Sequence, residues 1–301
     1  MISPGRIVYL ARRRLALGFR HWMAEAILQQ RILNWKISAD WPQATVPIHL
    51  LASRHDWRMA LWMLASFHHF SKHRWPVVLH EDGSLGDEEL KIFAGLFPHA
   101  KVWRHSESNE VMATKLARFP RCSAYRARMP HGIKCFDIPQ LAERQKFLLF
   151  DPDVLFFGAP QEILRWCEEE GDETSWFNED FQEPSPLSAR QALADLGIEL
   201  WPRVNSGLCL LQRNTVSDLA RMETFLAHPS LQAKNVPWRV EQTLLALSAS
   251  LAGRGGLLPP NYEVSPGNSR RPGGVARHYV GCVRDRFLAE GVFDLSKLLI
   301  P

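Results

Sequence analysis

The stretch FLLFDPDVLFF, residues 147–157, places two aspartates in the middle of an otherwise apolar run. Burying a carboxylate without a partner is costly, and a second like charge beside it raises that cost. Pro152 disfavours helical geometry at Asp151, and in an extended segment Asp151 and Asp153 point to the same face. We therefore predict that both carboxylates meet in one site at the end of a buried strand, where a divalent cation neutralises them.

A simpler interpretation of the same residues is a turn. Asp-Pro-Asp is good turn chemistry, and Asp-x-Asp triplets also occur by chance in chains of this size. A plain surface turn, however, does not require the strongly apolar sequence that continues on both sides of the triplet. The apolar flanks favour the cation site, and the turn stays open as the alternative.

Strand-like and helical patterns alternate from residue 46 onward. Strands are predicted over 46–53, 76–83 and 100–105, with helices over 56–71 and 86–97 between them. The remaining predicted elements are a helix over 136–143, strands over 173–180 and 204–212, helices over 185–197, 215–227 and 237–251, and irregular segments over 112–134 and 259–274. This alternation predicts an α/β fold with a mostly parallel central sheet flanked by helices, and ligands bind at the carboxyl ends of the strands of such sheets.

The N-terminal region differs from the rest in charge. Residues 1–40 carry seven basic side chains and two acidic ones, with apolar residues at helical spacing between them. We predict a basic helical extension over residues 1–44 and one domain over residues 45–301. The extension either rests on anionic lipid or packs on the domain with its arginines in solvent. Packing is favoured, since any surface helix is amphipathic.

Composition limits the class of protein. The chain has 301 residues, of which 46% are hydrophobic and 23% charged, so a packed globular core is expected. A net charge of +4 is too mild to predict a nucleic-acid partner. The five cysteines are scattered and form no Cys-x-x-Cys pair, which fits a reducing compartment, and no apolar run reaches transmembrane length. We predict a cytoplasmic protein, with contact to the inner face of the membrane through the N-terminal helix as an open alternative.

Further polar motifs accompany the aspartate pair. Asn205-Ser206-Gly207 opens an apolar strand, with an amide that can donate and accept and a glycine that permits close backbone approach. Glu241-Gln242 stands near the start of a predicted helix. His278 follows a loop rich in glycine and proline, and Gly281 and Arg284 come after it at intervals of three residues.

In this order, the motifs resemble a nucleotide-sugar-dependent glycosyltransferase of the GT-A fold, and most closely the retaining family 8 type. That family carries an Asp-x-Asp at the end of an apolar strand, an asparagine-glycine strand, an acidic-Gln pair and a C-terminal His-x-x-Gly-x-x-Lys. The resemblance extends over roughly residues 46–287. It implies transfer of a sugar, with retention, from a nucleoside diphosphate sugar that is expected to be UDP-linked, to a hydroxyl of a glycan or lipid-linked acceptor.

The resemblance also implies roles for individual residues. Asp151, Asp153 and His278 would coordinate Mn²⁺ or Mg²⁺, and the imidazole favours manganese because nitrogen ligands suit the harder ion poorly. The expected donor-binding residues are Asp151, Asp153, Asn205, Gly207, Gly281, Arg284 and Lys134. The expected catalytic residues, which face the sugar or the reacting centre, are Glu241, Gln242 and Asn205.

The chain departs from the family pattern at three places. Arg284 replaces the usual lysine, which keeps the charge but changes the hydrogen-bond geometry. Asp285-Arg286 follows it where Pro-Trp is usual, and Glu241 replaces an aspartate. In addition, the Tyr-x-Arg-type donor contacts expected from the family are represented only by Tyr125, Arg126, Arg128 and Lys134 in the basic stretch over 112–134.

Alternatives from other classes remain. A haloacid-type phosphatase also places Asp-x-Asp after an apolar strand, but it requires Thr or Val where this chain has Leu155. A sugar-phosphate nucleotidyltransferase requires a glycine-rich loop after its first strand, and LLASRHDWR, residues 50–58, contains no glycine. A non-catalytic carbohydrate-binding or scaffold protein could keep the same fold, and donor turnover would separate it from an enzyme.

Overall fold

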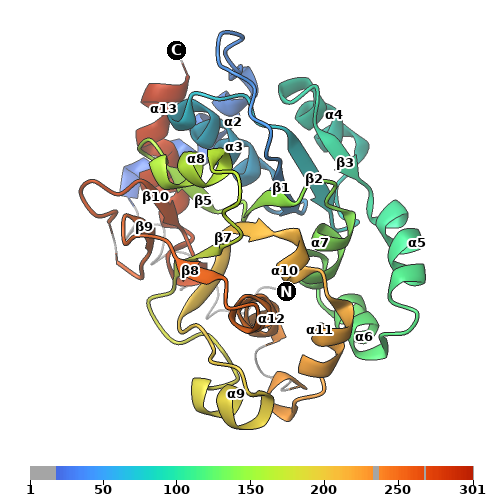
Figure 1. The fold of residues 1–301 in the computed structure, drawn as a ribbon. Coiled ribbons are helices and arrows are strands. Elements are labelled where there is room, and N and C mark those ends of the chain that lie inside the picture. Colours follow the sequence, from blue (N-terminus) through green and yellow to red (C-terminus); the bar gives the residue numbers. More distant parts are fainter. Residues whose placement is uncertain (1–17, 233–236, 268, 301) are drawn as a thin grey trace, which may run out of the picture.

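The computed structural model describes residues 18–232, 237–267 and 269–300. Two β-sheets organise the chain (Figure 1). The larger one has seven strands in the order β3-β2-β1-β4-β7-β6-β8. Its strands are β1 Ile48–Ala52, β2 Val77–Glu81, β3 Lys101–Trp103, β4 Lys146–Phe150, β6 Ser175–Glu179, β7 Val204–Gln212 and β8 Gly255–Leu257. Among the described residues of this larger sheet, the two ladders made by β7 are antiparallel and the other four are parallel, so the predicted α/β fold with a mostly parallel sheet is confirmed.

Helices cover both faces of this sheet. They are α3 Trp57–Ser71, α4 Asp87–Leu96, α5 His105–Lys115, α6 Pro120–Arg128, the π-helix η3 Ile133–Asp137, α7 Ile138–Leu141, α8 Gln161–Glu168, α9 Ala189–Leu196, α10 Arg213–Val216, α11 Leu219–Phe225, α12 Pro237–Leu251 and α13 Phe293–Leu299. Short helical turns complete the set: α2 Gln29–Arg31 and the elements η1 Ala24–Leu28, η2 Ile32–Asn34, η4 Pro229–Gln232, η5 Gly281–Val283 and η6 Phe287–Val292. In Figure 1, α3 and α8 lie on one side of the sheet, and α10, α11 and α12 lie on the other.

The two-residue period of the strands divides the core into two layers. On β4, Leu148 and Phe150 pack in the layer with α3 and α8, whereas Phe147 and Leu149 pack in the layer with α7 and α12. A strand buried on both faces must be apolar throughout. This explains why the stretch that carries the two aspartates is so strongly hydrophobic.

The stretch over 147–157 is not one strand. The chain leaves the large sheet after Phe150, turns at Asp151-Pro152-Asp153, and enters β5, Val154–Phe156, which belongs to a second sheet. That sheet has the order β5-β10-β9, with β9 Tyr262–Val264 and β10 Ala276–His278. The extended geometry expected at Asp151 and Asp153 is therefore wrong, because the backbone turns there, whereas the expected position of the aspartates at the end of a buried strand agrees with the end of β4. The aspartates nevertheless stand between two buried strands.

Two segments predicted to be irregular contain regular structure. Residues 112–134 hold the end of α5, all of α6 and the start of η3, and residues 259–274 include β9. Helix α6 begins at Pro120, where a missing N–H costs nothing in the first turn. Its apolar residues are few, so the hydrophobic period is weak, and strand β9 is too short to show one.

The N-terminal extension is attached to the domain where the structure describes it. Ala24, Leu28 and Ile32 are buried in the same layer as α3. Residues 1–17, which include four of its arginines, lie outside the described part of the chain. Across the described residues, no helix combines the length and the hydrophobicity needed to span a bilayer.

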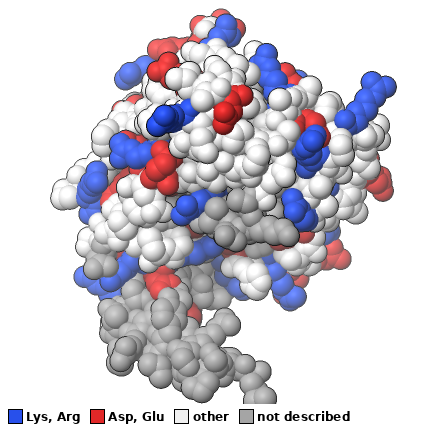
Figure 2. Space-filling view, turned by 90° about the horizontal axis from the view of Figure 1, so that it is seen from below, with Lys and Arg blue, Asp and Glu red and all other residues white. Residues whose placement is uncertain are grey.

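Charge is spread over the face shown in Figure 2. Lys and Arg side chains stand there among Asp and Glu side chains and uncharged surface. The net charge of +4 is thus not gathered into one patch on the described residues of that face.

Candidate active site

The Asp-Pro-Asp turn is tied to both sheets by backbone hydrogen bonds. The N–H of Asp151 donates to the carbonyl of Gly207 on β7 at 2.7 Å. The carbonyl of Asp153 accepts from the N–H of Tyr279, just after β10, at 2.9 Å. The turn is therefore held where β4 and β7 of the large sheet meet β5 and β10 of the small one.

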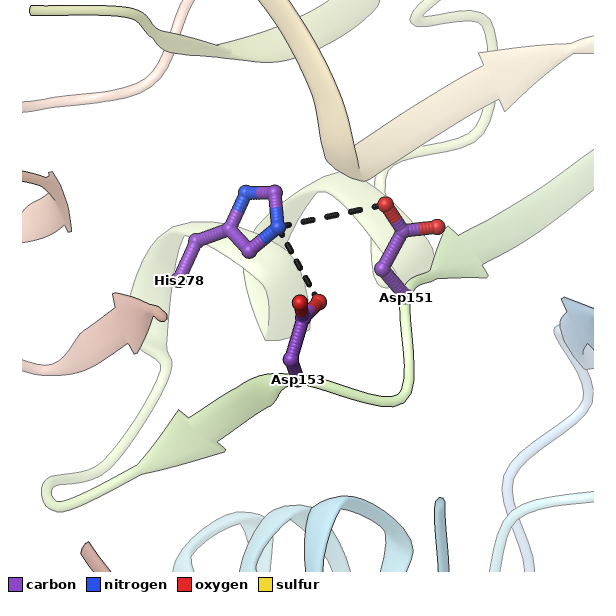
Figure 3. A group of neighbouring side chains, drawn as sticks. All are labelled: Asp151, Asp153 and His278. Carbon is purple, nitrogen blue, oxygen red and sulfur yellow. Dashed lines mark ion pairs between the residues drawn. The ribbon is translucent and has the colours of Figure 1, made fainter. Parts of the chain in front are cut away.

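His278 closes the site from the small sheet. It lies opposite Val154 in the antiparallel pair of β10 with β5, which brings its ring to the aspartates. Its Nε2 is 3.1 Å from Oδ1 of Asp153 and 3.9 Å from Oδ2 of Asp151 (Figure 3). Burial by itself would lower the pKa of His278, but Asp153 and Asp151 outweigh it and raise that pKa above its ordinary value.

Asn205 determines which nitrogen of His278 faces the aspartates. Its Oδ1 lies 2.8 Å from Nδ1 of His278 and also accepts the N–H of Gly207 at 3.0 Å. Its Nδ2 donates to Oδ2 of Asp180 at 2.8 Å, which fixes the orientation of the amide. Nδ1 of His278 must then carry a proton, so Nε2 is the nitrogen that points to the carboxylates.

Gly207 makes room for the histidine ring. A Cβ added at this position would lie 2.1 Å from Cε1 of His278, far inside van der Waals contact. The strand can carry only glycine here while His278 keeps its place. By contrast, a Cβ added at Gly281 would meet no atom within 4 Å, so packing does not explain a glycine at that position.

The donor set formed by Asp151, Asp153 and His278 fits a divalent cation. Their ligand atoms lie within 4.8 Å of one another. Two carboxylates and an imidazole oriented by a second hydrogen bond are the ligand types of transition-metal sites, and manganese accepts such a mixed set. In this way the structure brings together the three residues that the sequence analysis selected as metal ligands.

Lys134 joins the aspartate pair to Glu241. It projects from η3 and is almost fully buried, with 2% of its surface exposed. Its Nζ lies 2.8 Å from Oδ1 of Asp151 and 3.3 Å from Oε1 of Glu241, and it donates to Ser206 at 3.2 Å. Burial alone would lower the pKa of Lys134, but the two carboxylates raise it, so the ammonium stays charged.

Glu241 is buried at the start of α12. Its Oε2 accepts from Oγ of Ser206 at 2.9 Å. Burial and the nearby Asp151 carboxylate raise the pKa of Glu241, whereas the Lys134 ammonium lowers it. The net effect is a pKa above the ordinary value. Gln242 follows it and is also buried, and its Nε2 has no hydrogen-bond partner among the described residues.

Arg284 stands at the exposed edge of the cluster. Its Nε is 3.7 Å from Oδ2 of Asp153, and its Nη2 is 3.6 Å from Oδ2 of Asp56 at the start of α3. Its side chain keeps 45% of its surface exposed, so it can reach a ligand from solvent. Burial tends to raise the pKa of Asp153, but His278 and Arg284 lower it below its ordinary value.

The basic stretch contributes less than expected. Arg126 forms a bidentate pair with the buried Asp137, with both N–O distances 2.6 Å, and Nη1 donates to Asn109. Arg128 is exposed and donates to the carbonyl of Ala124. Lys134 is the basic side chain of this stretch that contacts both Asp151 and Glu241.

Sequence reasoning overlooked three supporting residues. The predicted site residues include none of these three: Ser206 enters only as the centre of Asn-Ser-Gly, and Asp180 and Asp56 have no predicted role in the site. Ser206 contacts Glu241, and Asp180 contacts Asn205, two of the predicted site residues. These contacts could be expected only once the pairing of the strands was known.

No family model matches the chain, and no curated protein matches it in sequence. Solved structures do. The bifunctional glycosyltransferase WbbM in its apo form aligns at 14% identity with a TM-score of 0.55, over 88% of this chain and 51% of that chain. The galactosyltransferase LgtC, in complex with donor and acceptor sugar analogs, aligns at 14% identity with a TM-score of 0.51, over 85% of this chain and 98% of that chain. The glycosyltransferase GlyE of Streptococcus pneumoniae aligns at 13% identity with a TM-score of 0.50, over 84% of this chain and 60% of that chain.

This chain thus spans about half the length of WbbM and nearly all of LgtC. At such low identities, the similarity shows the fold alone. The protein has the GT-A fold of nucleotide-sugar glycosyltransferases, as the sequence motifs predicted.

Proposed function

We propose that this protein is a metal-dependent glycosyltransferase that moves a sugar from a nucleoside diphosphate sugar to a hydroxyl acceptor. The observation that carries the proposal is the convergence of Asp151, Asp153 and the Asn205-oriented His278 at the junction of two sheets in a GT-A fold. The structural neighbour LgtC was solved with donor and acceptor sugar analogs, which supports this class of substrate.

The proposed cation is Mn²⁺, held by Asp151, Asp153 and His278. When bound, it would supply positive charge to the diphosphate and to the charge that develops on the leaving group. Mg²⁺ is the alternative, but an imidazole ligand suits it less well.

The chain's own residues would divide the remaining tasks. Arg284, at the exposed edge, would bind the diphosphate, and its planar guanidinium allows a bidentate contact. Asn205 and Gly207 would line the donor pocket, and the backbone at Gly281 would approach the diphosphate. Glu241 and Gln242 would face the sugar, with Lys134 holding Glu241 and Asp151 in place.

The finer features of the proposal rest on the sequence resemblance. They are a UDP-linked donor, a hexosyl group, retention of the anomeric configuration, a glycan or lipid-linked acceptor, and a cytoplasmic location for a domain over residues 45–301. No observation on the described residues favours the phosphatase or the nucleotidyltransferase over this proposal.

The test is a set of UDP- and GDP-sugars with and without Mn²⁺. Donor binding is followed by thermal shift, since a ligand of the native state raises its apparent stability, and turnover by release of the nucleoside diphosphate. We expect Mn²⁺-dependent binding and slow donor hydrolysis, and a large loss of both in Asp153→Asn. Asp195→Asn, at an exposed pair with His228, is the matched control and should behave like the wild type.

Two outcomes would reject parts of the proposal. Metal-dependent donor binding without turnover, with every donor and with added glycan acceptors, would identify a carbohydrate-binding protein. Undiminished donor binding in Asp153→Asn would show that the metal site lies elsewhere.

A further inference from the structure

The exposed apolar side chains of the protein are concentrated on two helices. The described residues expose nine large apolar side chains: Phe19, Trp22, Ile27, Leu33, Phe181, Leu193, Trp201, Leu251 and Leu298. Four of them belong to the N-terminal helical segment over 18–34, and Leu298 belongs to α13. The exposed fractions of Phe19, Trp22 and Leu298 are 67%, 57% and 61%.

These two helices adjoin each other. Element η1 of the N-terminal segment contacts both α13 and η6. We call the exposed side of residues 18–34 together with that of α13 the two-helix surface. Its helices are anchored from beneath, because Ala24, Leu28 and Leu295 are fully or almost fully buried in the core.

The anchored side accounts for the attachment of these helices, but not for the apolar residues on the opposite side. A helix packed on a domain ordinarily presents polar residues to solvent. The rings of Phe19 and Trp22 contact each other in a tilted arrangement, with ring centroids 5.7 Å apart, and so form one exposed aromatic pair. Clustered exposure of this kind marks an interaction surface.

Positive charge lies at the joint between the two helices. The ring of Phe293 is contacted by the guanidinium of Arg20 at 4.9 Å and by the ammonium of Lys297 at 4.7 Å. The carboxylates on the described residues of these helices are Glu25, 3.8 Å from Nε2 of His21, and Asp294. The sequence immediately before the surface, residues 1–17, adds four arginines and no acidic residue.

We infer that the two-helix surface docks on an anionic lipid bilayer. Aromatic and aliphatic side chains would enter the boundary between headgroups and acyl chains, and Arg20 and Lys297 would meet lipid phosphates. A second copy of the chain fits less well, since a two-fold interface would bring these like charges against each other. The inference does not depend on the proposed glycosyl transfer.

The experiment is cosedimentation of the full chain with vesicles of phosphatidylcholine alone or mixed with phosphatidylglycerol. We expect binding to the mixed vesicles, weakened by added salt. In the variant Trp22→Ser/Ile27→Ser we expect a loss of about tenfold or more. Both side chains are exposed, and thermal unfolding should confirm that the variant folds normally.

The matched control removes apolar surface elsewhere. Leu193→Ser/Leu251→Ser changes two exposed side chains on α9 and α12 and should bind vesicles like the wild type. Equal binding to neutral and mixed vesicles, or equal losses in both double variants, would overturn the inference. So would unchanged binding in the Trp22/Ile27 variant. Sedimentation velocity adds one further outcome: a dimer that dissociates in this variant, without vesicle binding, would reassign the surface to self-association.

Discussion

Oδ1 of Asn205 lies 2.8 Å from Nδ1 of His278, across the junction between the two sheets. Because the same oxygen accepts the N–H of Gly207 and the amide nitrogen donates to Asp180, the asparagine cannot turn without breaking other hydrogen bonds. It thereby presents Nε2 of His278 to the aspartates.

The first prediction concerns this contact. Asn205→Ala should lower Mn²⁺ affinity by roughly 10- to 100-fold, the usual cost of removing the partner that orients a metal-binding histidine. Titration calorimetry or Mn²⁺ electron paramagnetic resonance would measure it. Asn214→Ala, at an asparagine on α10, is the control. Equal affinities in the wild type and Asn205→Ala would show that Asn205 does not orient the histidine.

The second prediction compares two glycines. Gly207→Ala places a Cβ 2.1 Å from the His278 ring and must displace it, whereas Gly281→Ala adds a methyl group in open space. We expect Gly207→Ala to abolish Mn²⁺ binding and to destabilise the fold by about 1–3 kcal/mol, the range for an overpacked core position. Gly281→Ala should change the stability by less than about 0.5 kcal/mol. Paired metal titrations and urea unfolding would measure both effects, and intact metal binding in Gly207→Ala would exclude His278 as a ligand.

The third prediction concerns the buried lysine. Lys134→Met removes the cation that faces Asp151 and Glu241, and an uncompensated buried charge costs about 3–5 kcal/mol. The pKa of Glu241, already raised by burial, should rise further, so the variant should regain stability as the pH falls and Glu241 takes up a proton.

Urea unfolding at several pH values would measure this behaviour. The double variant Lys134→Met/Glu241→Gln should recover much of the lost stability at neutral pH, because no carboxylate at position 241 then needs a partner. A single variant as stable as the wild type, or one destabilised equally at all pH values, would mean that the ion pairs contribute little.

Sequence reasoning predicted the elements whose apolar period is strong. Strand β7 was predicted with its observed bounds, since all nine of its residues are buried. The family resemblance named Asp151, Asp153 and His278 together as metal ligands, and in the structure their ligand atoms lie within 4.8 Å of one another. The role of Asp180 could not be found in this way, because it depends on the register of β6 with β7, which shifts at an irregularity between Phe177 and Asn178. The turn at Pro152 was misjudged because both of its flanks are equally apolar.

The fourth prediction concerns the strand that carries His278. Its neighbour Arg277 is fully buried, and Nη1 lies 2.7 Å from Oε2 of Glu290, which also accepts from the hydroxyl of Tyr279. Glu290→Gln leaves the guanidinium without a counter-charge and should cost about 3 kcal/mol or more. Hydrogen exchange should increase at residues 276–280, and Mn²⁺ affinity should fall. Glu143→Gln, at an exposed pair with Lys101, is the control and should leave the stability close to that of the wild type. Equal costs in the two variants would contradict the prediction.

The fifth prediction is a pH dependence of stability set by His68 in α3. Its Nδ1–H donates to the carbonyl of Leu64 at 2.8 Å, and its Nε2 accepts the N–H of Trp75 at 3.2 Å, so only the neutral ring satisfies both neighbours. Burial lowers the pKa of His68 from 6.5 to about 4. Between these values the unfolded chain binds the proton and the folded chain does not, so stability falls as the pH is lowered from about 6.5 to 4. The neutral His68 ring thus contributes roughly 3 kcal/mol to the free energy of unfolding above about pH 6.5, and this contribution is lost by about pH 4.

His68→Gln removes the titration, and its stability profile from urea unfolding should be shallower than the wild-type profile over this range. Parallel profiles would mean that His68 titrates normally in the folded protein.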